Sequence, residues 1–145
     1  MAGISGAIVP ATAALESDRP AADIRAVQLA REWLITRKSG HTRYSYGLDI
    51  GIRVPRPGAA LGSEPRPPAP AKAPSWLDWC SAIGADPLHA TETHLAGWAR
   101  GMEAAGLSAP TVARKISAVS SWYQWLVRNK HAAHNPAESL PRPEV

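Results

Sequence analysis

Apolar residues recur every three or four positions in five stretches of the chain, which is the spacing of one face of an α-helix. The stretches cover about residues 21–38, 40–52, 75–83, 91–105 and 108–130. No segment of useful length alternates apolar and polar residues, so we expect no strands. The pattern therefore predicts an all-α fold.

Two of these helices show their predicted buried face clearly. For the first helix this face holds Ile24, Val27, Ala30 and Leu34, with Trp33 beside it. The last helix is the longest, and its face is formed by Val112, Ile116, Val119, Tyr123, Leu126 and Val127, widened by Trp122 and Trp125. The chain has six Trp and no Phe, so Trp must supply most of the large core side chains.

Two segments lack a helical pattern. Residues 1–20 are small and aperiodic, which predicts a flexible N-terminal arm. Residues 53–74 contain seven prolines, and no helix or central strand tolerates that many missing N–H donors. This stretch is expected to be an extended linker or insertion, placed inside a helical domain that spans residues 21–134.

Charge is distributed unevenly along the predicted helices. The formal net charge is +4. Residues 75–103 hold four acids against one arginine, whereas residues 104–134 hold four basic residues and no acid. Such asymmetry indicates a face kept for a polyanion. The alternative is two solvated helix faces that attract each other.

A polar and basic stripe accompanies the apolar face of the last helix. It contains Arg114, Ser117, Ser121, Gln124 and Arg128, bordered by Thr111 and Lys115. The second helix opens on a similar run, Arg37 to Arg43. Hydroxyls and cations at a helix N-terminus suit phosphate binding, and two such starts on one bundle could straddle a DNA duplex. The plainer interpretation is an amphipathic helix whose solvated face happens to be basic.

Four motifs, in order, resemble the core-binding domain of tyrosine recombinases, the phage-integrase family. Ser39-Gly40-His41-Thr42-Arg43 through Tyr46, Asp49 and Ile50 is similar to the family's Ser-x-x-Thr-x-x-x-Tyr-x-x-Asp-Leu helix. The other three are Trp76-Leu77-Asp78-Trp79-Cys80 with Asp86-Pro87-Leu88, the run from Gly106 to Ala118, and Trp122 to Leu126 with Asn135-Pro136-Ala137.

The resemblance implies a small four- to five-helix orthogonal bundle that closes over DNA, with residues 135–145 as a connector toward a catalytic domain absent from this chain. The Pro-rich insertion falls where the family usually has a continuous helix, so that helix is either split and bridged or loses its second half. Combining the two basic helix starts with the resemblance, the expected DNA-binding residues are Arg37, Lys38, His41, Thr42, Arg43, Ser108, Thr111, Arg114, Lys115, Ser121 and Arg128.

No catalytic machinery is expected in the chain itself. The family cleaves DNA with a tyrosine nucleophile, two arginines and a His-x-x-Arg motif, and the sequence contains no His-x-x-Arg. The five histidines lack convergent carboxylate or cysteine partners, and Cys80 is better explained as a buried small hydrophobe than as a nucleophile. We therefore expect no metal and no other cofactor.

The expected function is DNA binding within DNA integration or site-specific recombination, with double-stranded DNA as the partner and other recombinase subunits as possible partners. A membrane or a small-molecule substrate is not expected, and the single cysteine fits a cytoplasmic location. The alternatives are a protein-interaction module, with Trp122 and Trp125 in an interface, or an integrase remnant that acts as a competitor or decoy.

Overall fold

The computed structural model describes residues 21–58 and 71–140. Within these ranges the chain forms five α-helices and one short 3₁₀ helix and has no strands, which confirms the predicted all-α class. The elements are α2 (Ala21–Ile35), α3 (Gly40–Ile50), α4 (Trp76–Ile83), η2 (Pro87–His89), α5 (Glu92–Ala104) and α6 (Ala109–Arg128). The predicted arm, the middle of the Pro-rich stretch and the end of the predicted connector lie outside the described residues.

Side-chain caps fix where the helices begin. Ser39, Ser75, Thr91 and Ser108 each accept a hydrogen bond from the backbone N–H three residues further on, which satisfies a donor that the first helical turn leaves free. The helix ends were predicted less well. α2 ends at Ile35 rather than Lys38, and the last helix ends at Arg128 rather than Lys130.

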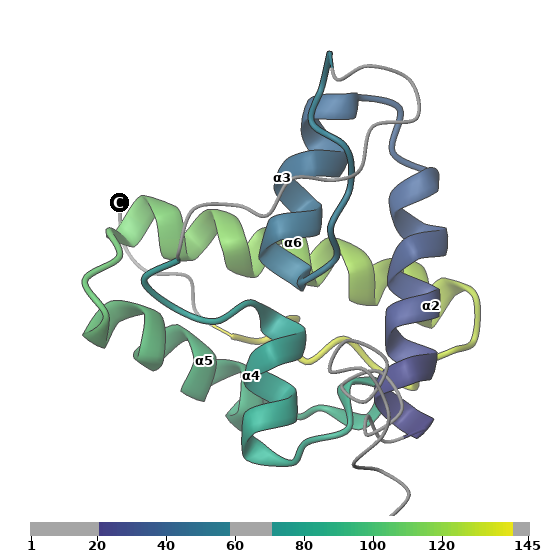
Figure 1. Ribbon diagram of the computed structural model, residues 1–145. Coiled ribbons are helices and arrows are strands. Elements are labelled where there is room, and N and C mark those ends of the chain that lie inside the picture. The colour runs from purple at the N-terminus through teal and green to yellow at the C-terminus, as the bar shows by residue number, and fades with distance from the viewer. Residues whose placement is uncertain (1–20, 59–70, 141–145) are drawn as a thin grey trace, which may run out of the picture.

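The helices are arranged around α6, which contacts α2, α3 and α5. Figure 1 shows α6 running across the molecule, with α3 and α2 standing across it and α5 below it. The crossing of α3 over α6 agrees with the orthogonal bundle that the resemblance implied. It also places residues near the C-terminal end of α3 against the first half of α6.

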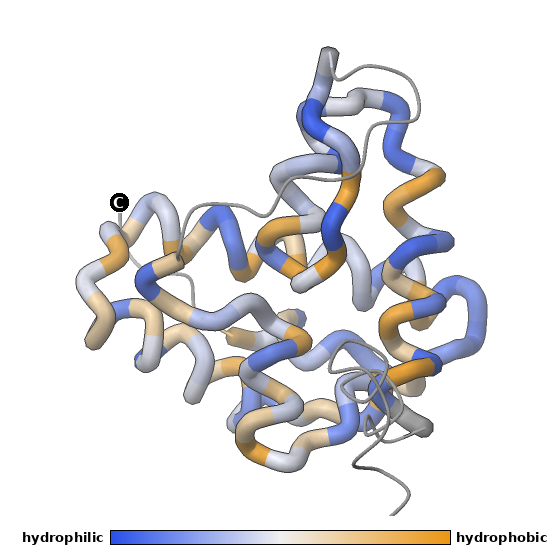
Figure 2. The backbone as a smooth tube through the Cα atoms, in the orientation of Figure 1, coloured by the Kyte–Doolittle hydropathy of each residue, from blue (hydrophilic) through white to orange (hydrophobic). Residues whose placement is uncertain are grey.

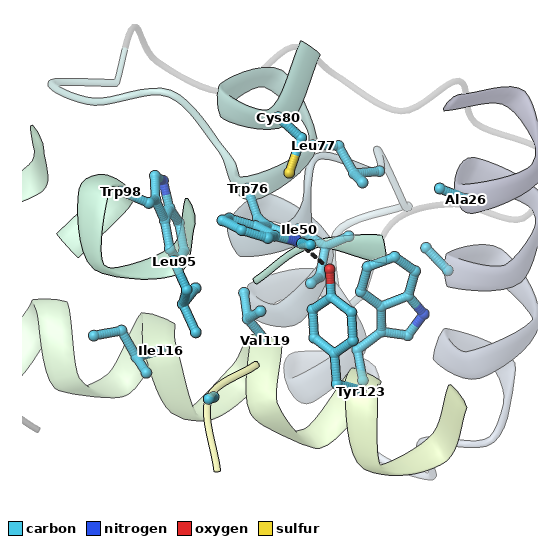
Figure 3. Close-up of a cluster of buried hydrophobic side chains, with 14 of the residues drawn as sticks. Ala26, Ile50, Trp76, Leu77, Cys80, Leu95, Trp98, Ile116, Val119 and Tyr123 are labelled. Atoms are coloured by element: carbon cyan, nitrogen blue, oxygen red, sulfur yellow. Dashed lines mark hydrogen bonds between the residues drawn. The ribbon is translucent and has the colours of Figure 1, made fainter. Parts of the chain in front are cut away.

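Tryptophan fills the centre of the bundle, as the absence of Phe required. The rings of Trp33, Trp76, Trp98 and Trp122 are at most 1% exposed. The Trp76 ring lies 5.5 Å from the Trp98 ring and 6.3 Å from the Tyr123 ring, measured between centroids. Figure 3 shows these side chains meeting between α4, α5 and α6, where each large aromatic ring buries a large apolar area.

The predicted buried face of α2 is wrong at Ile24, which is 42% exposed. The side chains that α2 buries instead include Ala26, Leu29 and Trp33. Trp33 stacks flat on Tyr46 of α3 at 5.4 Å, so the largest side chain sets how α2 is rotated. On α6, Val127 is likewise 37% exposed, whereas the other predicted aliphatic positions of its face are buried.

The Pro-rich stretch interrupts one helix and the chain then resumes close by. α3 ends at Gly51, whose φ of 112° is a left-handed conformation that favours glycine. A Cβ atom placed on Gly51 would lie 2.5 Å from the Oγ atom of Ser75, the cap of α4. The two helix ends therefore touch across the insertion. The sequence left two outcomes open, a helix that is split and bridged or one that loses its second half. The structure shows the first, with α3 and α4 as the two parts.

Tyr123 connects three buried segments through its hydroxyl group. It donates a hydrogen bond to the Pro87 carbonyl at 2.5 Å and accepts one from Trp76 Nε1 at 3.0 Å. Tyr123→Phe would leave both groups buried without a partner, which should lower the free energy of unfolding by about 1–3 kcal/mol. Urea denaturation followed by circular dichroism measures this change. Tyr44 is only half-buried, so Tyr44→Phe is the matched control. Equal stability of the two variants would contradict the role of the two Tyr123 hydrogen bonds.

Alkaline pH should destabilise the fold because two buried groups, the Cys80 thiol and the Tyr123 hydroxyl, resist losing their protons. Burial raises the pKa of the Cys80 thiol from 9.0 to about 12, and burial also raises the pKa of Tyr123 well above 10.0. Because the unfolded chain loses these protons at lower pH than the folded one, the stability that these two groups contribute should be constant below about pH 9 and fall as the pH rises from 9 toward 12. Each group contributes at most about 1.4 kcal/mol per pH unit to that slope.

The measurement is a series of urea midpoints between pH 7 and pH 11, for the wild type and for Cys80→Ala. The variant is expected to lose stability less steeply above pH 9. An identical slope in both proteins would show that the Cys80 thiol ionises as readily in the folded chain as in the unfolded one.

Candidate nucleic-acid interface

A buried carboxylate joins α3 to α6. Asp49 is 1% exposed and accepts hydrogen bonds from both Arg114 and Lys115. Arg114 binds it through two nitrogens, at 2.7 and 3.1 Å, and Lys115 through Nζ at 2.9 Å. A carboxylate inside the fold needs such partners, since an unpaired buried charge is very unfavourable. The three residues form one ion cluster that sets the crossing of the two helices.

This cluster changes how Arg114 and Lys115 must be interpreted. Both were predicted as cations available to DNA. Their side chains are 50% and 24% exposed, so each can still present charge outward while one side of it is held by Asp49. The hydrogen bond to Asp49 raises the pKa of the Arg114 guanidinium above its usual value, and desolvation opposes that rise. The cluster of three charges keeps a net charge of +1.

The start of α3 carries several of the predicted residues. Arg43 turns back along the chain and donates from one guanidinium nitrogen to the carbonyl oxygens of Arg37 and Lys38, at 2.6 and 3.0 Å. It therefore fixes the turn between α2 and α3. Lys38 and His41 are exposed there, and Thr42 lines a shallow hollow with Arg37 and Lys38.

The start of α6 offers fewer free backbone donors than the sequence suggested. Pro110 has no N–H, and the N–H of Thr111 is bonded to Ser108, whose hydroxyl also donates to that of Thr111 at 2.9 Å. The hydroxyls of this start are thus engaged with each other and with the backbone. An anion near this helix end would be held mainly by the cations of the first two turns.

A groove beside the start of α3 gathers basic residues from three segments. Its volume is about 640 Å³, and none of the described residues that line it is acidic. The basic residues lining it are Arg31 of α2, His41 and Arg43 of α3, and Arg53 and Arg56 of the segment after α3. Sequence reasoning found His41 and Arg43 but missed the other three, because Arg31 lies inside a helix and the segment at 53–58 was interpreted as linker.

A second hollow, of about 500 Å³, lies near the end of α3 and includes Arg53 again. There Arg53 is accompanied by Lys72 and by Lys115, with Asp78 as the acidic residue among those lining it. Arg53 therefore belongs to both hollows. It connects the basic start of α3 with the ion cluster on α6.

The remaining predicted residues lie further along α6. Arg128 is exposed and lines a hollow against the segment that follows the helix, while Ser121 is half-buried. They share a face with Arg114, but the structure does not gather them with the α3 residues. Trp122 is fully buried and Trp125 is half-buried and packed against the core, so these two rings do not form an exposed apolar patch.

Two further features are absent from residues 21–58 and 71–140, the part of the chain that the structure describes. No group of three or more His, Cys, Asp and Glu side chains could hold a metal ion in this part of the chain. Among these same residues, no helix has the length and apolar character needed to cross a membrane.

Comparison with known proteins found two similarities, one to a family model and one to a curated protein. Residues 74–130, which cover α4 to α6, match the model of the phage integrase N-terminal SAM-like domain. In this part the chain is similar to that family. The chain is also similar to tyrosine recombinase XerD of Chlorobaculum tepidum, with 27% identity over 107 residues, or 74% of this chain. The chain spans 28% of the length of that relative. No solved structure matches the chain significantly.

Removing the Asp49 charge should weaken the fold strongly. Asp49→Asn keeps the shape of the side chain but leaves two cations without their anion. We expect a loss of about 2–4 kcal/mol, somewhat below the roughly 3–5 kcal/mol for a fully buried pair, because Arg114 is half exposed. Urea denaturation checks this value, with Asp78→Asn on the exposed side of α4 as control. Equal stability of the two variants would show that the cluster does not hold α3 on α6.

Proposed function

We propose that this chain is the DNA-binding unit of a tyrosine-recombinase-type protein and holds duplex DNA through the basic start of α3 and the basic face of α6. The family match supports a role in site-specific recombination. The contacts would be made to phosphates by the residues predicted from the sequence. Domain bounds of 21–134, with residues 135–145 leading to a further domain, are part of the same proposal.

The observation that carries the proposal is the division of charge across the fold. The exposed acids Asp78, Glu92 and Glu103 lie on α4 and α5. By contrast, α3 and α6 together hold one acid, Asp49, which is buried and bound by two cations. A phosphate backbone approaching α3 and α6 would therefore meet basic groups without a nearby exposed carboxylate of those helices. Attraction of this kind dominates the affinity of proteins for DNA.

The unit is proposed to bind DNA without cutting it. Strand cleavage in the family needs two arginines, a His-x-x-Arg motif and a tyrosine nucleophile, and the sequence has no His-x-x-Arg. The most buried tyrosine, Tyr123, is already committed to the Trp76 and Pro87 bonds. Because phosphate contacts position a protein without specifying sequence, this unit alone should discriminate weakly between DNA sites.

Binding should depend steeply on salt. If about three to five phosphates are neutralised, the logarithm of the affinity should fall with the logarithm of salt concentration at a slope of roughly −3 to −4. Fluorescence anisotropy of a labelled random-sequence duplex, titrated between 50 and 200 mM salt, measures that slope. Binding that does not respond to salt, or no binding at the lowest salt by a folded protein, would contradict the proposal.

The variants for this test must leave the ion cluster intact, since neutralising Arg114 and Lys115 would leave the buried Asp49 carboxylate without a cation. Lys38→Gln/Arg128→Gln removes two exposed charges instead, and the slope should become less steep by about 1.8. Arg25→Gln/Arg100→Gln removes the same charge from exposed positions of α2 and α5. An equal effect of the two pairs would show that net charge alone, and not this face, drives binding.

A further inference from the structure

We propose that the DNA interface extends onto both ends of the Pro-rich insertion, where Arg53, Arg56 and Lys72 bind backbone phosphates. This inference rests on the proposed function and adds residues that neither the sequence pattern nor the family match assigned. It concerns only the described ends of the insertion, residues 53–58 and 71–74. Three observations support it: the first end is packed along α3, Arg56 lies over the Tyr44 ring, and Arg53 joins two basic hollows.

The first end of the insertion does not leave the bundle but runs back along α3. The N–H of Ile52 bonds to the Gly47 carbonyl at 2.8 Å, and Ile52 is buried. A Cβ atom on Gly47 would lie 2.5 Å from the Ile52 carbonyl oxygen and 3.4 Å from a methyl group of Val54, so only glycine allows this close approach. Figure 2 shows the segment running beside α3 with hydrophilic and hydrophobic positions alternating along it.

That alternation presents Arg53 to solvent, and Arg56, which follows the alternating part, is exposed as well. Ile52 is buried and Val54 packs against the core, while Arg53 and Arg56 are exposed. Pro55 and Pro57 flank Arg56, and a proline ring fixes the backbone φ angle. The Arg56 guanidinium also lies over the Tyr44 ring, 5.6 Å from its centre. The Arg56 side chain is therefore partly ordered before any ligand arrives, which lowers the entropy lost on binding.

Arg53 makes the basic surface continuous along α3. On one side it shares the larger groove with Arg31, His41, Arg43 and Arg56, and none of the described residues lining that groove is acidic. On the other side it shares the second hollow with Lys72 and Lys115, where Asp78 offsets part of the charge. α3 has 11 residues. A helix of that length extends about 16 Å, which spans roughly five phosphates of one DNA strand when measured along the duplex axis.

Phosphate is the ligand that suits this arrangement best. Several guanidinium groups gather there, with no carboxylate among the described residues of the groove, and they favour an anion with many acceptor oxygens. A single free anion would occupy one hollow. A nucleic acid backbone would occupy both hollows, since Arg53 connects them and the cations continue onto the α6 residue Lys115.

The test compares Arg53→Gln/Arg56→Gln with the Arg25→Gln/Arg100→Gln control in the same anisotropy titration. Loss of two phosphate contacts should make the salt slope less steep by about 1.8 and weaken binding roughly tenfold or more at 0.1 M salt. The control should bind like the wild type. Arg53→Lys/Arg56→Lys keeps the charge and should restore most of the slope. Lys72→Gln should by itself reduce the slope by about 0.9.

The results separate a failure of this inference from a failure of the proposed function. Unchanged affinity and slope in Arg53→Gln/Arg56→Gln, with the wild type bound to DNA, would overturn this inference and leave the proposed function standing. An equal effect of the control pair would also overturn it, as would weaker binding with an unchanged slope. A folded wild type that binds no DNA would instead remove the proposed function itself. Circular dichroism and urea midpoints confirm that each variant is folded.

Discussion

The ion cluster of Asp49, Arg114 and Lys115 is the interaction on which the rest of the interface depends. A carboxylate that is 1% exposed can be charged only where cations reach it, and both cations come from another helix, 65 and 66 residues along the chain. The cluster therefore fixes both the position of α3 across α6 and the place where positive charge emerges. Its net charge of +1 lies beside the hollow that contains Arg53.

The elements of the fold were largely predictable from local sequence signals. The caps Ser39, Thr91 and Ser108 stand directly before apolar periodic runs, and all three begin helices in the structure. The rotation of α2 was not predictable, because Ile24 and Trp33 compete for the buried face and the outcome depends on stacking against Tyr46. That contact joins two helices, and periodicity within one helix carries no information about it.

The site was only partly predictable, because it too depends on contacts between helices. Arg114 and Lys115 were identified from their place on a helix, but their pairing with Asp49 depends on the crossing of two helices. The role suggested for Arg53, Arg56 and Lys72 was missed because prolines dominate the segment between α3 and α4. One local signal was present: Arg53 lies between the apolar residues Ile52 and Val54, which is the pattern of a half-buried extended segment. The close approach at Gly47 that permits it is visible only in the structure.

The central claim is that DNA lies on α3, the start of α6 and the ends of the insertion. Backbone NMR of the ¹⁵N-labelled chain, titrated with a short duplex at low salt, tests it most directly. The account predicts the largest amide shift changes at residues 37–43, 52–56 and 111–115, and small changes along α5. The strongest changes on α5, or changes confined to the exposed end of α4, would contradict it and would place the partner on the acidic side of the bundle.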